Sequence, residues 1–129
     1  PSRMATRILS RVMVEALASS LPFGPWERVS SGLYTQFFGT EIFIEGTTLA
    51  QIIGGGSPAV QAITTINFLW IYTPIYDLRI GLHGVNAQTD GFTLSGGHYF
   101  TMDTGTIASL NLYNTASIPV YPIVAAGQV

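Results

Sequence analysis

The sequence predicts a mainly β protein, an antiparallel β-sandwich or jelly roll with an N-terminal amphipathic helix. From residue 33 onward apolar residues recur with a period of two, which is typical of half-buried strands. Turn signals rich in Gly, Asn and Ser recur at short intervals through the C-terminal half. No helical segment remains there to connect parallel strands, so we expect antiparallel sheets.

The N-terminal segment, residues 1–21, predicts a helical arm, because residues 3–21 repeat with the helical period of 3.6. Its apolar face comprises Ile8, Leu9, Val12, Met13, Ala16 and Leu17, and its opposite face comprises Arg3, Arg7, Arg11 and Glu15. Pro22 would end the helix. A helix of this length is marginal in water without packing. Its apolar face therefore needs either the chain's own sandwich or a neighbouring subunit.

The row of three arginines on this segment has two interpretations. It forms a solvated face, or it binds acidic groups of a partner, since the planar guanidinium suits bidentate contacts with carboxylates. The chain has no lysine, and its formal net charge is −2, which argues against a nucleic-acid partner. The expected partner-binding residues are Arg3, Arg7 and Arg11 for polar contacts and Ile8, Val12 and Leu17 for apolar contacts.

The remaining chain predicts a turn-rich linker over residues 22–32 and the β domain over residues 33–129. Residues 47–53 predict a short helical turn, and the glycine-rich stretch 54–58 predicts a flexible loop. The expected strands are residues 33–38, 41–45, 60–73, 77–83, 92–94, 98–103, 110–113 and 120–125.

Charge is scarce in this chain. Charged residues make up 9% of the sequence and the mean hydropathy is +0.39, whereas about a quarter of a typical soluble domain is charged. We therefore expect exposed apolar surface that binds other subunits, in a homo-oligomer such as a trimer or in a lattice. The alternative is an ordinary domain whose surface uses neutral polar residues. Residues 58–76 are apolar but interrupted by polar side chains, which favours a buried strand over a membrane span.

Few residues in the sequence could carry chemistry. The chain has no cysteine and two histidines, His83 and His98, which both fall at predicted strand ends. Glu41 and Glu45 share a strand face, but Phe43 separates them, so a solvated face is favoured over an acid–base pair. No nucleophile elbow, phosphate-binding loop or metal-ligand spacing is present in the sequence. We expect no catalytic site, no cofactor and no metal.

Aromatic residues make up 12% of the sequence and have two interpretations. They fill the core or anchor subunit contacts, or they form a stacking platform for sugars. Strand register decides between these, because a shift by one residue exchanges the two faces. The candidates are Trp26, Trp70, Tyr72, Tyr76, Tyr99 and Tyr113.

The order of strands and turns over residues 75–125 is given by DLRIGLHG, DGFTLSGGHYFTMDTG and LNLYN, followed by a short exit strand. This order resembles small β-sandwich virion proteins of tailed bacteriophages, the decoration or cement type and related head and tail components. The resemblance implies a non-enzymatic protein on the capsid surface that binds the major capsid protein and bridges its subunits. The alternatives are a neck or tail adaptor that binds neck or tail subunits, or a carbohydrate-binding tip domain of the tail. No catalytic residue is implied.

Overall fold

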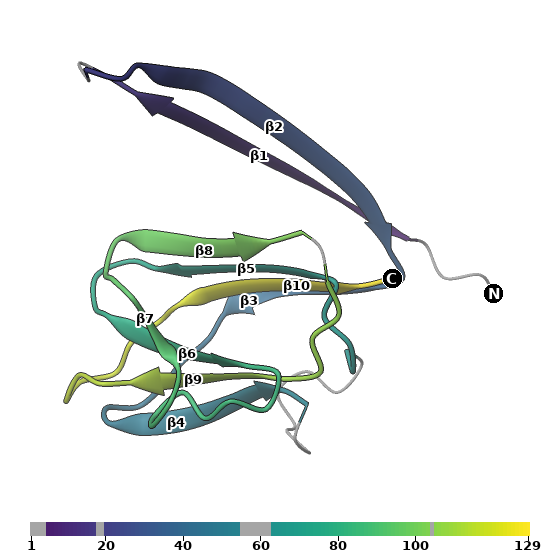
Figure 1. Cartoon of the computed structure of the whole chain (residues 1–129). Coiled ribbons are helices and arrows are strands. Elements are labelled where there is room, and N and C mark those ends of the chain that lie inside the picture. The colour runs from purple at the N-terminus through teal and green to yellow at the C-terminus, as the bar shows by residue number, and fades with distance from the viewer. Residues whose placement is uncertain (1–4, 18–19, 55–62, 104) are drawn as a thin grey trace.

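The computed structural model describes residues 5–17, 20–54, 63–103 and 105–129. These residues form ten strands and no helix. Eight strands make two four-stranded antiparallel sheets, and the first two make a separate ribbon (Figure 1). The strands are β1 Thr6–Ala16, β2 Phe23–Tyr34, β3 Gln36–Glu41, β4 Thr48–Ile53, β5 Phe68–Thr73, β6 Leu78–Leu82, β7 Phe92–Leu94, β8 His98–Met102, β9 Leu110–Asn114 and β10 Ile123–Gln128.

The two four-stranded sheets are wound as a jelly roll. The first sheet has the order β3-β10-β5-β8 and the second sheet the order β4-β9-β6-β7. The antiparallel pairs β3–β10, β4–β9, β5–β8 and β6–β7 are those of one long hairpin ribbon. The additional pairs β5–β10 and β6–β9 join the folded ribbon into two sheets. The β-sandwich expected from the sequence therefore fits the structure.

The core lies between the two sheets and follows from the alternation of side chains along each strand. Leu69 and Ile71 on β5 point inward and are fully buried. They belong to the same cluster as Ile80 on β6, Leu112 on β9 and Val124 on β10. Burying one such side chain stabilises the fold by roughly 1.5–3 kcal/mol. The side chains of β5 that point outward lie on the face of the first sheet that faces the ribbon.

The predicted N-terminal helix is wrong. Its described residues form β1, which pairs antiparallel with β2 along most of its length, and the residues predicted as a linker lie largely in β2. Ile8, Val12 and Val14 explain the difference, because β-branched residues at alternate positions suit a strand. The apolar residues of this segment are also compatible with a helical spacing. The pairing with β2 selects the strand.

Other predictions also differ from the structure. Residues 47–53 were expected to form a helical turn, but Thr48–Ile53 is strand β4, paired with β9. The expected strand over residues 60–73 is shorter, because the regular strand begins at Phe68. Residues 60–62 and most of the expected glycine-rich loop lie outside the described residues.

Candidate docking surfaces

The β1–β2 ribbon, which we call the arm, projects from one end of the sandwich (Figure 1). β2 ends at Tyr34 and β3 begins at Gln36, so the arm leads directly into the first sheet. Toward its tip the ribbon stands away from that sheet (Figure 1). Because an isolated two-stranded ribbon is only marginally stable in water, the arm needs contacts beyond its own strand pairing.

The base of the arm packs on the first sheet through Tyr34 and Ile8. The Tyr34 ring is buried, with its centroid 5.9 Å from that of Phe68. A β-carbon at Gly127 would lie 2.9 Å from the Tyr34 ring and 3.2 Å from Ile8 Cδ1, so glycine permits this close approach. Burial, with a smaller contribution from the charge of Asp103, raises the pKa of Tyr34.

The outer face of the arm, which points away from the sandwich, combines exposed apolar and charged side chains. Leu9 and Met13 are 65% and 60% exposed, and Leu33 and Val29 lie on the same face of β2. The charged and polar members of this face pair with one another. Arg11 Nε lies 3.5 Å from Glu27 Oε1, and Arg7 Nη1 donates to Ser31 Oγ at 3.0 Å. Exposed pairs of this kind stabilise a fold by about 1 kcal/mol or less. A partner can therefore replace these pairings with its own contacts at little cost in free energy.

The tip of the arm carries an exposed aromatic pair. The ring centroids of Phe23 and Trp26 are 6.5 Å apart, and Trp26 is 66% exposed. Gly24 has a φ of +80°, and a β-carbon there would lie 2.4 Å from the carbonyl oxygen of Val14. Glycine is therefore required where β2 begins beside β1. Single exposed apolar residues are common, but a contiguous set on a projecting ribbon indicates an interaction surface.

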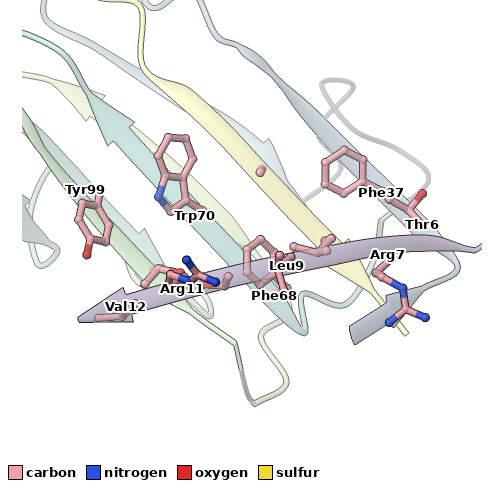
Figure 2. Close-up of a pocket in the computed structure, with 13 residues that line it drawn as sticks. Thr6, Arg7, Leu9, Arg11, Val12, Phe37, Phe68, Trp70 and Tyr99 are labelled. Atoms are coloured by element: carbon pink, nitrogen blue, oxygen red, sulfur yellow. The ribbon is translucent and has the colours of Figure 1, made fainter. Parts of the chain in front are cut away.

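A cleft of about 600 Å³ lies between the arm and the outward face of the first sheet. Residues 6–12 of β1 border one side, and Phe68, Trp70 and Tyr99 border the other (Figure 2). The rings of Trp70 and Tyr72 stack with centroids 5.9 Å apart and an interplanar angle of 22°. Tyr99 is the cross-strand partner of Tyr72. Aromatic rings therefore cover part of the sheet face under the arm.

The structure divides the predicted partner-binding residues between two faces of the arm. Arg7 and Arg11 lie on the outer face, whereas Ile8 and Val12 are half-buried on the face toward the sandwich. Leu17 follows β1 near the tip and is 75% exposed. The position of Arg3 lies outside the described residues.

Sequence reasoning missed the contribution of β2 to this surface. Leu33 and Val29 join the outer face because β2 pairs with β1, and the expected linker gave them no role. The local sequence gave no strand signal there, because Glu27, Val29, Ser31 and Leu33 share one strand face and are polar and apolar in turn.

A second cleft, of about 470 Å³, lies beside His83 and Ser109 on the second sheet. His83 has a φ of 55°, and its Nδ1 accepts the backbone N–H of Ala108 at 3.2 Å. Ser109 Oγ accepts the N–H of Gly84 at 2.7 Å. Both side chains therefore hold backbone in place. In the described part of the chain, no group of three or more His, Asp or Glu side chains is placed to hold a metal ion.

The fold and its surfaces define a jelly-roll protein with a projecting apolar arm. Comparison of the chain with protein-family models, curated proteins and solved structures gave no match. Over the residues that the structure describes, no helix is long and apolar enough to cross a membrane. The exposed surfaces are therefore the features that bear on function.

Proposed function

We propose that the chain is a non-enzymatic structural subunit of a virion, a decoration or cement-type protein that binds the capsid and bridges neighbouring subunits. The observation that carries the proposal is the outer face of the arm, where Leu9, Met13, Val29 and Leu33 are exposed together. Removing apolar surface from water is favourable by roughly 25 cal/mol per Å². A partner that covers this face would therefore bind favourably and would also stabilise the ribbon.

Two further observations support a virion component. Jelly rolls occur in viral capsid proteins and in lectins, although a fold alone does not determine function. The strand order of residues 75–125 resembles decoration and related head or tail proteins of tailed phages. A position on the capsid surface with the major capsid protein as partner is the proposal, and a neck or tail position is its closest alternative.

Bridging would act by mass action. A protein that binds the assembled shell and not its free subunits shifts the equilibrium toward the shell by RT ln(1 + [L]/Kd). The arm suits this role because it stands away from the first sheet toward its tip and leaves its outer face open to a neighbouring subunit (Figure 1). The low charge of the chain, 9%, is consistent with surface that is covered in an assembly.

The proposal is tested by co-sedimentation of the purified chain with capsid shells from the virus that encodes it. The wild-type chain should pellet with the shells. The double variant Val29→Ser/Leu33→Ser should bind at least about tenfold more weakly, because it removes two apolar side chains from the outer face of the arm. Both side chains are exposed, so the fold should be retained.

The matched control is Val85→Ser/Leu49→Ser, which removes one exposed valine and one exposed leucine from the sandwich. This control should pellet like the wild-type chain. A wild-type chain that stays in the supernatant would exclude capsid binding. Equal binding by the arm variant and the control would exclude the arm as the docking element.

A glycan-binding domain is the second candidate function, and the stacked Trp70 and Tyr72 rings favour it. Sugars stack on exposed aromatic faces, and the cleft beside Trp70 gives them space. If this function is correct, Trp70→Ala should abolish glycan-array signals, while Trp26→Ala, on the arm, should leave them unchanged. The absence of any signal from the wild-type chain would eliminate this candidate.

A further inference from the structure

Charge is divided unequally between the arm and the sandwich. The arm, residues 6–34, contains three arginines and two glutamates, a formal charge of +1, whereas residues 35–129 contain one arginine and five carboxylates, a formal charge of −4. The sandwich arginine, Arg79, is already bound, since its Nε donates to Ala87 O at 2.8 Å and its Nη2 to Gly91 O at 2.7 Å. The arm of one copy and the sandwich of another therefore attract each other.

The end of the sandwich farthest from the base of the arm carries an exposed apolar surface, which we call the far-end patch. Its members come from the β3–β4 connection, the β5–β6 turn and the segment before β10, and they are Phe43, Ile75, Tyr76, Ile118 and Tyr121. The Phe43 and Tyr121 rings are 5.5 Å apart. A cleft of about 90 Å³, lined by residues 73–76 and 119–121, opens within the patch.

Carboxylates flank the far-end patch. Glu41 and Glu45 lie two residues before and after Phe43, and both are exposed. Asp77 follows Tyr76, and its Oδ1 accepts the N–H of Gly96 at 2.9 Å, which fixes this negative charge at the rim. The patch therefore combines an apolar centre with an acidic border.

The tip of the arm has the complementary character. Trp26 and Arg28 lie on the same face of β2, opposite Val14 and Val12 of β1. An exposed aromatic side chain beside a guanidinium matches an apolar patch with an acidic rim. Tryptophan and arginine are also the residue types that most often dominate the binding energy of protein interfaces.

We infer that the arm tip of one copy binds the far-end patch of a second copy, with Trp26 on the patch and Arg28 toward its carboxylates. The inference rests on the docking role of the arm in the proposed function and names one partner for it. The arm and the patch are different surfaces of the same chain. Their contact therefore produces a ring, a filament or a pair of copies that exchange arms.

The test uses sedimentation velocity on the full chain and on two charge-reversing variants. The arm variant is Trp26→Glu/Arg28→Glu, and the patch variant is Phe43→Arg/Glu45→Arg. The wild-type chain should self-associate, and each variant alone should do so at least about tenfold more weakly. An equimolar mixture should form a complex again, because the patch variant keeps a native arm and the arm variant keeps a native patch.

The matched control is Val85→Arg/Asp90→Arg, which makes the same kind of change on the exposed β6–β7 connection. It should self-associate like the wild-type chain, and thermal melting should show that all variants are folded. A monomeric wild-type chain, an unimpaired patch variant or a mixture that fails to associate would each overturn the inference. A chain that self-associates as described but does not pellet with capsid shells would instead overturn the virion function and leave this contact standing.

Discussion

Replacing Asn114 with alanine is expected to destabilise the fold by about 3 kcal/mol or more, because the fully buried side chain of Asn114 is the centre of a hydrogen-bond network. Asn114 Nδ2 donates to Ile118 O at 2.7 Å and to Glu45 O at 3.0 Å, and Oδ1 accepts the N–H of Ala116 at 2.9 Å. Alanine leaves these backbone groups without that partner in a site where Asn114 is 0% exposed. Urea unfolding of both proteins measures the loss.

The control for this prediction is Asn114→Asp, which keeps the size of the side chain and the acceptor for Ala116. It replaces the amide donor with an oxygen that faces three carbonyl oxygens, so the fold should favour the protonated form of the new carboxyl. A group whose pKa is raised by folding loses its stability contribution as the pH rises. The variant should therefore be more stable at acidic than at neutral pH. A loss below about 1 kcal/mol for Asn114→Ala would contradict the role given to the network.

The effect of Asn114 also bears on the far-end patch. Its four hydrogen bonds connect the segment after Phe43 with the segment that contains Ile118. Both of these apolar residues belong to the patch. A weakened network should therefore impair self-association before the whole sandwich unfolds.

The strands of the second half could be predicted from the sequence because their signals are local. The alternation in residues 77–83 gave β6, and the residues between glycine-rich turns gave β8 and β9 nearly at their observed bounds. The last strand was expected over residues 120–125 but is Ile123–Gln128. Proline supplies no N–H, so regular pairing starts after Pro122.

The helix error shows what a single sequence leaves open. Residues 6–16 satisfy the helical period and also contain β-branched residues at alternate positions. The choice depends on β2, a strand partner from the segment that was expected to be a linker. The local sequence pattern does not indicate which distant strands pair. It therefore does not indicate that β3 and β10, the first and last strands of the sandwich, are neighbours.

The sequence predicted that apolar surface is exposed, but it did not predict where that surface lies. The low charge indicated exposed apolar surface, and the structure locates much of it on the arm and at the far end of the sandwich. One of the two interpretations of the aromatic residues placed both tryptophans on one platform, but Trp26 lies on the arm and Trp70 lies in the cleft. Strand register separates them, and the register follows only from the complete pairing.

Ile71→Ala is expected to destabilise the fold by about 2–5 kcal/mol, whereas Leu9→Ala on the arm should cost about 0.5 kcal/mol or less. Ile71 is 0% exposed on β5, between β10 and β8, and its truncation leaves a cavity between the two sheets. Ile71→Val is the graded control and should cost about 0.5–1.5 kcal/mol, because it removes a single methylene group. Urea unfolding at one protein concentration, low enough to keep all variants monomeric, gives the three values. Similar losses of unfolding free energy for Ile71→Ala and Leu9→Ala would contradict the packing of the two sheets. The expected difference would show that Leu9 on the arm contributes little to the folding of the sandwich.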